Sequence, residues 1–353
     1  MGRLLFNPMR TALIGYGLGG SAFHAPFLNT TPGLGFSAVV TGNPERAAEV
    51  RSRYPRVEVL SSVDQVWTGN YDLAVVTTPN RFHHEHAGTA LEHGLHVVVD
   101  KPFSGTSAEA RTLAERAETN NRVLVPFHNR RWDGDFLTAQ QLLTEGELGD
   151  VHRFESRFER WRPEPKQSWK ESGDPADLGS ILFDLGTHLI DQAITLFGRP
   201  THVYAELRTL RNGAKTDDDT FLALTHTNGT VSHLWASALA ANPGPRFRLL
   251  GTKAAYVKHG MDPQEEQLKA GKAPTNNNNW GADPKTNWGT LQADNKETPV
   301  PTLNGNYPAF YTGVATALNN NTPPPVSPWD AVTGLEIIEA ATKSAHTKQT
   351  ITL

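Results

Sequence analysis

The stretch from Gly15 to Gly20, with the sequence GYGLGG, constrains the fold of this chain more than any other feature. It follows a short apolar run, Thr11–Ile14, and it opens a segment of helical composition over 20–28. Glycines at this spacing allow a tight turn, close approach of a pyrophosphate to the backbone and close packing of helix on strand. The motif in this position therefore predicts a dinucleotide-binding βαβ unit. The contact residues expected here are Gly15, Tyr16, Gly17, Leu18 and Gly20.

Short apolar runs alternate with helical segments through the rest of the first part of the chain. The predicted strands are 36–40, 73–76, 96–99 and 123–125, and the predicted helices are 44–53, 83–94 and 107–120. Strands that are apolar throughout and alternate with helices are typical of a parallel sheet covered on both faces. Because 353 residues exceed what one hydrophobic core usually supports, we expect two domains. We predict an α/β chain with a doubly wound Rossmann domain over 9–128, a second domain over 129–353, and residues 1–8 as an extension.

The residues after the second predicted strand indicate which dinucleotide is bound. NAD-selective sites usually place Asp or Glu at the end of this strand, where it binds the ribose 2′-hydroxyl. Here the strand is followed by Thr41-Gly42-Asn43, without a carboxylate. Thr41 and Asn43 can donate hydrogen bonds, and Arg46 can pair with a 2′-phosphate. Glu45, on the following helix, is the competing candidate. This pattern favours NADP, with NAD as the open alternative.

From about residue 151 the hydrophobic pattern changes to alternation. The predicted strands are 151–158, 203–207, 220–227, 230–237, 246–250 and 254–258, and Asn228-Gly229 between two of them is a strong hairpin signal. Alternation predicts an α+β domain with a large open, mostly antiparallel sheet that has one polar and one apolar face. We interpret the Asn-, Gly- and Pro-rich stretch 259–300 as a long functional or oligomer-contacting loop, and 330–346 as a surface helix.

Composition excludes several classes of protein. The net charge is -4, with acidic and basic residues interspersed, which argues against nucleic-acid binding. No apolar run approaches the roughly 20 residues that cross a bilayer, and the N-terminal apolar patch is too short for a signal peptide. The chain has no cysteine, which excludes disulfides and thiolate metal sites. We expect a cytoplasmic protein that acts on a small molecule, with no metal, nucleic-acid or membrane partner.

Lys101 is the first candidate for chemistry. It follows the predicted strand 96–99, at the carboxyl edge of the sheet, where open α/β folds bind their ligands. Pro102 disfavours a helical conformation of Lys101 and so keeps it at this edge. A lysine in this position can bind a substrate hydroxyl and stabilise a developing alkoxide.

The segment 179–198 supplies the second group of candidates. At 100° per residue, Asp184, His188 and Asp191 fall on one stripe, opposite an apolar side. The stripe contains no Lys, Glu or Arg, unlike most solvated faces, so we interpret it as a face turned towards a wet pocket; a plain amphipathic helix is the alternative. Asp184 can orient the imidazole of His188 four residues on. That imidazole is suited to moving an alcohol proton during hydride transfer.

Together these residues resemble the Gfo/Idh/MocA family of oxidoreductases. The resemblance is carried by the glycine-rich turn, Thr78-Pro79-Asn80 with His83, Asp100-Lys101-Pro102, and Asp184-x-x-x-His188 with Asp191. It implies that Lys101 and His188 are catalytic and that Asp184 helps to hold the substrate. It also implies that Thr78, Pro79, Asn80, His83 and Asp100 line the nicotinamide side, although members usually carry Glu where Asp100 stands. The open sheet would mediate homodimers or homotetramers.

Further segments resemble the NADP-dependent scyllo-inositol dehydrogenase branch of that family: 127–132, Trp161-Arg162-Pro163 with Trp169, and 280–283. They suggest Asn129, Trp161 and Trp169 as walls of the substrate pocket, together with Asp184, His188 and Asp191; for the tryptophans, ordinary packing is the alternative. The expected reaction is oxidation of a secondary alcohol on a cyclic polyol. A sugar dehydrogenase or reductase of the same fold is one alternative. A dinucleotide-sensing regulator without activity is the other, and it would not need Lys101, Asp184 and His188 together.

Overall fold

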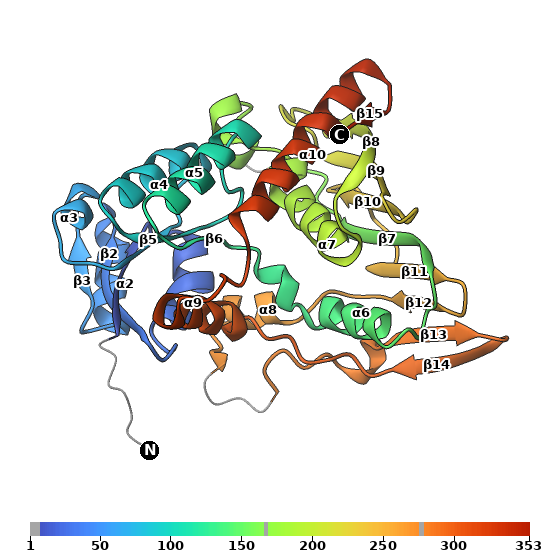
Figure 1. Ribbon diagram of the computed structural model, residues 1–353, viewed down its shortest axis with the longest axis horizontal. Coiled ribbons are helices and arrows are strands. Elements are labelled where there is room, and N and C mark those ends of the chain that lie inside the picture. The colour runs from blue at the N-terminus through green and yellow to red at the C-terminus, as the bar shows by residue number, and fades with distance from the viewer. Residues whose placement is uncertain (1–7, 166–168, 275–278) are drawn as a thin grey trace. The chain divides into compact units, whose positions relative to one another are not determined.

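The computed structural model describes residues 8–165, 169–274 and 279–353, and the chain separates into two compact units (Figure 1). The first, which we call the Rossmann unit, contains the chain up to His128, the described part of 266–278, and 307–329. The second, which we call the sheet unit, contains 129–265, 279–306 and 330–353. The sequence-based division, which placed all of 129–353 in the second domain, is too simple. Two later segments pack with the Rossmann unit, one of them carrying helix α9, Pro308–Asn320.

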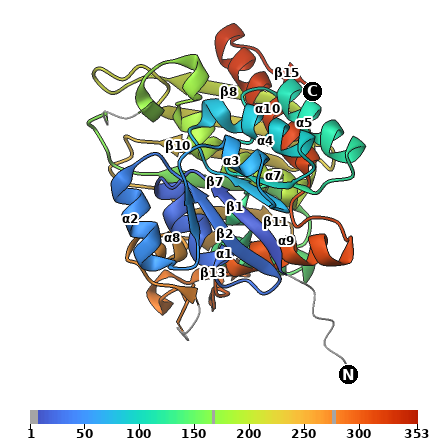
Figure 2. The same ribbon diagram turned by 90° about the vertical axis from the view of Figure 1, so that its left-hand side faces the viewer.

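The Rossmann unit is built on a parallel six-stranded sheet with the strand order β3-β2-β1-β4-β5-β6, as expected for a doubly wound fold. The strands are β1 Met9–Ile14, β2 Leu34–Val40, β3 Glu58–Leu60, β4 Leu73–Val76, β5 His96–Val99 and β6 Leu124–Pro126. The helices are α1 Ala25–Leu28, α2 Pro44–Arg53, α3 Asp64–Trp67, α4 His83–Glu92 and α5 Ser107–Thr119. Helices α4 and α5 pack on one face of the sheet, and α1 and α2 on the other (Figure 2).

The strand register brings the candidate residues of this unit to one edge. Ile14 at the end of β1 pairs with Val40 of β2 and with Val76 of β4, and Val76 in turn pairs with Val99 of β5. At their carboxyl ends these strands consist of buried apolar residues, which explains why the sequence pattern located them. Strand β3 was not predicted from the sequence, because it has three residues and begins with an exposed glutamate.

The sheet unit contains a nine-stranded mixed sheet with the order β14-β13-β12-β11-β7-β10-β9-β8-β15. Its strands are β7 Val151–Glu159, β8 Pro200–Arg208, β9 Asp219–His226, β10 Val231–Ser237, β11 Phe247–Gly251, β12 Ala255–Lys258, β13 Gly289–Ala293, β14 Lys296–Val300 and β15 Ile351–Thr352. All neighbours pair antiparallel except β7 and β10, which run parallel. The predicted hairpin is present: Gly229 takes a φ of +86° between β9 and β10.

Helices cover the apolar side of this sheet. They are α6 Gly134–Thr144, α7 Thr187–Phe197 and α10 Pro328–Thr347, and α7 packs against β7 and β10 (Figure 1). The predicted helix near 330–346 is therefore present as α10, although it buries a full apolar face that includes Leu335 and Ile338 rather than lying on the surface. Among the described residues no helix is long and apolar enough to cross a membrane.

The described residues of 259–300 do not form the long loop that the composition suggested. They include helix α8, Gln264–Lys269, and the hairpin of β13 and β14. A buried polar network explains the order: Asp262 accepts hydrogen bonds from the Gly134 and Gln264 amides, and the Gln264 side chain accepts one from Trp280. Gln264 also donates to the Trp132 carbonyl. The asparagine- and glycine-rich composition therefore predicted a loop, although side-chain hydrogen bonds hold this segment in a defined structure.

Candidate active site

The glycine-rich turn has the shape that a dinucleotide requires. Gly15 adopts a φ of +101°, and a side chain there would meet the Thr77 carbonyl at 2.8 Å. A side chain at Gly20 would collide with the Gly15 carbonyl, whereas Gly17 faces open space. The first and last glycines are thus required for the turn itself, and Gly17 leaves its backbone open to an approaching ligand. The turn is followed by a π-helical segment, Gly19–His24, and then by α1.

The tip of β2 carries the residues expected to distinguish NADP from NAD. Asn43 caps α2, because its side chain accepts a hydrogen bond from the Arg46 amide at 3.0 Å. Thr41 accepts a hydrogen bond from the Asn43 amide at 3.3 Å. The Arg46 side chain is exposed in the first turn of α2. The tip is therefore a capped helix start with a cation beside it and no carboxylate at the strand end.

The residues after β4 approach those after β5 through His83. His83 is 1% exposed, its Nδ1 lies 2.7 Å from the Pro102 carbonyl oxygen and its Nε2 lies 2.8 Å from the Thr78 carbonyl oxygen. Burial lowers the pKa of His83. Its ring is thus engaged by the two loops, so any influence of His83 on a nicotinamide runs through the Thr78 and Pro102 backbone. Pro79 and Asn80 lie between Thr78 and His83 in the sequence, at the start of a 3₁₀ turn, Asn80–Phe82.

Asp100 and Lys101 follow β5 directly. The Lys101 amide donates a hydrogen bond to Oδ1 of Asp100 at 2.8 Å. Burial alone would raise the pKa of Asp100, but His24, His83 and Lys101 hold it at about 2. The carboxylate is therefore ionised beside the candidate catalytic lysine. His24 lies 3.7 Å from this carboxylate and was not predicted from the sequence, because a single histidine in a short helical segment carries no motif.

The segment with Asp184 and His188 is not a regular α-helix. Leu182–Gly186 is π-helical and only from Thr187 does α7 begin. The rotation of 100° per residue assumed for the predicted stripe therefore does not hold across Asp184, because a π-helix turns less per residue. Such π segments often mark functional sites. Asp184 is partly exposed and lies 3.8 Å from Arg160. His188 is 5% exposed, and its ring centre lies 6.2 Å from that of Phe158, with the two rings at 74°.

Asp191 is bound within the sheet unit rather than turned towards a wet pocket. It is 3% exposed, and Arg131 donates to both of its carboxylate oxygens, with distances of 2.6 to 3.2 Å. Arg131 also pairs with Asp330 of α10 at 2.9 Å. Asp191 therefore anchors α7 through Arg131, and its expected contact with the substrate stays a prediction. Nothing in the sequence indicated that Asp191 pairs with Arg131, because Arg131 lies in the stretch 127–132, which was considered only for its resemblance to the scyllo-inositol dehydrogenase branch.

The three residues expected to form pocket walls differ in exposure. Asn129 is buried at the start of a 3₁₀ turn, Asn129–Trp132, whereas Trp161 is 57% exposed and Trp169 is 37% exposed. The backbone of Trp161 forms an isolated antiparallel bridge with Leu239. Packing inside a core is therefore excluded as the role of the two tryptophans.

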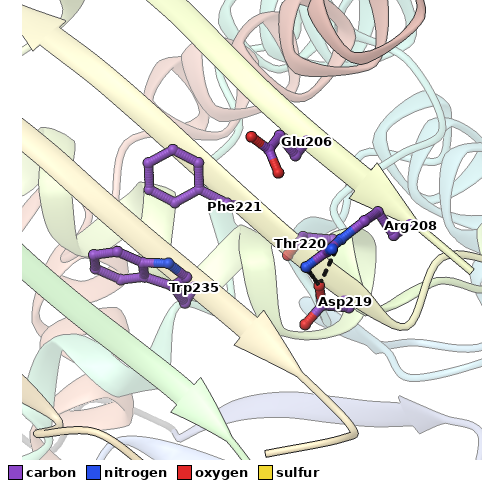
Figure 3. A pocket seen from close by; sticks show the side chains of 6 residues that line it. All are labelled: Glu206, Arg208, Asp219, Thr220, Phe221 and Trp235. Atoms are coloured by element: carbon purple, nitrogen blue, oxygen red, sulfur yellow. Dashed lines mark hydrogen bonds and ion pairs between the residues drawn. The ribbon is translucent and has the colours of Figure 1, made fainter. Parts of the chain in front are cut away.

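A cavity of about 310 Å³ lies on the nine-stranded sheet (Figure 3). It is lined by Glu206, Arg208, Asp219, Thr220, Phe221 and Trp235. Arg208 pairs with Asp219, as the dashed lines in Figure 3 mark. Phe221 is the neighbour of the buried Leu222 in β9, and Trp235 is the neighbour of the buried Leu234 in β10. Because neighbouring side chains in a strand point to opposite faces, both rings point to the side of the sheet opposite α7. This cavity is therefore separate from the His188 segment.

Comparison with known proteins places these features in one family. Residues 9–128 match the family model described as oxidoreductase family, NAD-binding Rossmann fold, and residues 140–353 match oxidoreductase family, C-terminal alpha/beta domain. The chain is 41% identical to the uncharacterized oxidoreductase YdgJ of Escherichia coli, over 98% of this chain and 99% of that protein.

It is also 35% identical to scyllo-inositol 2-dehydrogenase (NADP(+)) IolW of Bacillus subtilis, over 100% of this chain and 98% of that protein. The solved structure of the oxidoreductase yvaA from Bacillus subtilis superposes with a TM-score of 0.92, at 34% identity, over 98% of this chain and 100% of that one. The chain therefore belongs to the Gfo/Idh/MocA family of oxidoreductases.

Proposed function

We propose that this protein is an NADP(H)-dependent dehydrogenase that interconverts a secondary alcohol of a cyclic polyol, scyllo-inositol, and the corresponding ketone. The observation that carries the proposal is the full-length similarity to IolW, named as an NADP-dependent scyllo-inositol 2-dehydrogenase. The β2 tip agrees with that cofactor, because Arg46 is exposed beside Thr41 and Asn43 and the strand ends without a carboxylate.

The residues present fit a dinucleotide. Gly15 and Gly17 would admit the pyrophosphate, Arg46 would pair with the 2′-phosphate, and the backbone after β4 and β5 would border the nicotinamide. The bound cofactor supplies the hydride acceptor in the direction of alcohol oxidation. Tyr16 and Leu18 complete the proposed contacts on the turn.

Lys101 and His188 would share the chemistry on the alcohol. Lys101 donates a hydrogen bond to the reacting oxygen and stabilises the negative charge that develops there. His188 accepts the hydroxyl proton, a transfer that an imidazole can perform near neutral pH. The alcohol carbon thus loses a hydride and its oxygen loses a proton, which balances the oxidation. Asp184, ionically linked to Arg160, would orient the substrate.

Turnover by the purified protein tests this function. Scyllo-inositol, myo-inositol and common aldoses are each offered with NADP⁺ and with NAD⁺. We expect rapid turnover of scyllo-inositol with NADP⁺. Turnover of an aldose alone would replace the polyol with a sugar substrate, turnover with NAD⁺ alone would overturn the cofactor assignment, and tight NADPH binding without any turnover would support a dinucleotide sensor.

We also propose that copies of this chain associate through the side of the nine-stranded sheet that carries Phe221 and Trp235. These rings lie 5.2 Å apart, and Arg157 stacks 3.9 Å from the centre of the Trp235 ring. Half-buried aromatic and arginine side chains on a broad sheet face are typical of interface centres. Light scattering should give a dimer or tetramer for the wild type and a smaller species for Trp235→Asp, and an unchanged mass would contradict this surface.

A further inference from the structure

Three polar side chains from distant parts of the sequence meet inside the Rossmann unit. Tyr311 comes from α9, His24 ends the π-helical segment after the glycine-rich turn, and Asp100 follows β5. The Tyr311 hydroxyl lies 2.6 Å from Nδ1 of His24, and Nε2 of His24 lies 3.7 Å from Oδ2 of Asp100. We call these residues the Asp100 triad.

The proposed arrangement of protons in the triad follows from its two outer members. Burial and the nearby Asp100 raise the pKa of Tyr311 well above its usual value, so its hydroxyl remains a donor. The pKa of Asp100 is about 2 in spite of burial, chiefly through His24, so its carboxylate remains an acceptor. In this arrangement Nδ1 of His24 accepts from Tyr311, and the ring proton resides on Nε2, which faces Asp100 at 3.7 Å.

The carboxylate of Asp100 connects the cofactor turn with the candidate catalytic lysine. Its Oδ1 accepts the Lys101 amide hydrogen at 2.8 Å. Its Oδ2 occupies the space that a side chain on Gly19 would need, 2.8 Å from the ideal Cβ position. Rotation of this carboxylate would therefore disturb the backbone of Lys101 on one side and the glycine-rich turn on the other.

His24 is the side chain that faces this carboxylate from inside the unit. It is fully buried, and its ring centre lies 4.0 Å from that of Phe127, so the imidazole has little freedom to move. In the described part of the chain its Nε2 makes no hydrogen bond within the usual distance, and it faces Asp100 instead. Buried polar atoms are nearly always paired, so an imidazole kept in this position calls for an explanation.

We propose that His24, held by Tyr311, is a positioning residue that fixes the Asp100 carboxylate between the glycine-rich turn and Lys101. Neither His24 nor Tyr311 is part of the motifs that indicate the family. The inference rests on the proposed catalytic role of Lys101. It predicts that loss of the His24 contact slows the chemical step while the protein still binds its cofactor.

Three variants separate this role from simple packing. Tyr311→Phe removes the hydroxyl and keeps the ring, His24→Met removes both nitrogens, and His24→Gln retains an N–H donor at the place of Nε2. We expect kcat for the polyol to fall by about 10-fold or more in the first two variants, because small misplacements of reacting groups cost up to about 100-fold. The KM and the NADPH dissociation constant should change little, and His24→Gln should restore most of kcat.

His226→Gln is the matched control. His226 is also buried and bonded through both ring nitrogens, to the Gly198 carbonyl and to Ser232, but it lies in the sheet unit. We expect it to lower the melting temperature and to leave kcat unchanged. Equal kcat in the wild type, Tyr311→Phe and His24→Met would overturn the proposal, as would a parallel loss of kcat and of NADPH binding in both variants.

Nitrogen-15 NMR of the histidine rings tests the triad without any substrate. At neutral pH the signals of His24, assigned by comparison with His24→Gln, should show a bare Nδ1 and a protonated Nε2, and Tyr311→Phe should disturb this pattern. A proton on Nδ1 of the wild type would overturn the arrangement. If the wild type turns over no polyol or sugar, the proposed function fails, and this measurement still decides whether the triad exists.

Discussion

The two sheets of this protein offer different surfaces for function. The parallel sheet of the Rossmann unit is packed by helices on both faces, so its candidate residues stand at the carboxyl edge, where β1, β2, β4 and β5 end in register. The mixed sheet carries its candidate residues on a covering segment, the π turn and α7. In the first unit the backbone positions the chemistry, whereas in the second buried side-chain pairs hold a helix in place.

Replacing Lys101 by Met should produce the largest effect. If the edge of the parallel sheet supplies the group that stabilises the developing alkoxide, kcat should fall by about 10²–10³-fold, the usual loss for such a donor. NADPH affinity, measured by fluorescence titration, should stay near that of the wild type because the glycine-rich turn is untouched. Turnover close to the wild-type rate would remove Lys101 from the chemistry.

Replacing Asp191 by Ala should have the largest effect on stability. Arg131 would keep its buried charge and lose the partner that binds it through both carboxylate oxygens. Removing one partner of a buried pair costs about 3–5 kcal/mol, and the remaining contact with the more exposed Asp330 sets the expected loss towards the lower end of that range. Thermal or urea unfolding measures this loss. Glu266→Ala, at the exposed pair with Lys269, is the control and should cost less than about 1 kcal/mol. A small effect of Asp191→Ala would mean that α7 is held by its apolar face alone.

Two buried carboxylates, one in each unit, respond to acid with opposite sign. Burial, with help from Asp135, raises the pKa of Asp262 from 3.8 to about 6. The folded protein then binds a proton between about pH 4 and 6 that the unfolded chain does not, so this group makes the protein less stable as the pH rises through that window, by up to about 3 kcal/mol. Asp100, with its lowered pKa, stabilises above pH 3.8 and loses this contribution only as the pH falls towards about 2.

The melting temperature, recorded between pH 4.5 and 7.5 for the wild type and for Asp262→Asn, separates the Asp262 contribution from all others. The difference between the two proteins should favour the wild type progressively as the pH is lowered through 6. A difference that does not depend on pH would show that Asp262 has an ordinary pKa and that its network holds the 259–300 segment in another way.

The sequence predicted those parts of the molecule that depend on short-range pattern. Apolar strands, the glycine-rich turn and the Asn228-Gly229 hairpin are local, and the structure confirms them. Features that depend on distant partners were missed or wrong. Asp191 meets Arg131 sixty residues away, and His24 meets Tyr311 at a separation of 287 residues.

The helical segments of both candidate sites show a second limit of prediction from the sequence. The first helix and the Asp184 helix were each predicted as regular, yet each begins with a π-helical segment, Gly19–His24 and Leu182–Gly186. Residue type does not distinguish π from α turns, because both bury the same apolar side chains. The prediction of a loop over 259–300 was wrong for a different reason. Hydrogen bonds of Asp262 and Gln264 hold this segment, and the spacing of apolar residues does not reveal them.

Cofactor preference should give the smallest effect, because it depends on one exposed side chain at the edge of the parallel sheet. Arg46→Ala should raise the KM for NADP⁺ by about 10-fold, equivalent to about 1.4 kcal/mol for one charge-assisted contact, and leave that for NAD⁺ almost unchanged. Arg51→Ala, in the last turn of the same helix, is the control and should alter neither. Thr41→Asp should reverse the preference, because a carboxylate at the strand end repels a 2′-phosphate and accepts a ribose hydroxyl. Equal losses with both cofactors in Arg46→Ala would place Arg46 outside the 2′-phosphate site, and the tip of β2 would then bind the dinucleotide through its backbone alone.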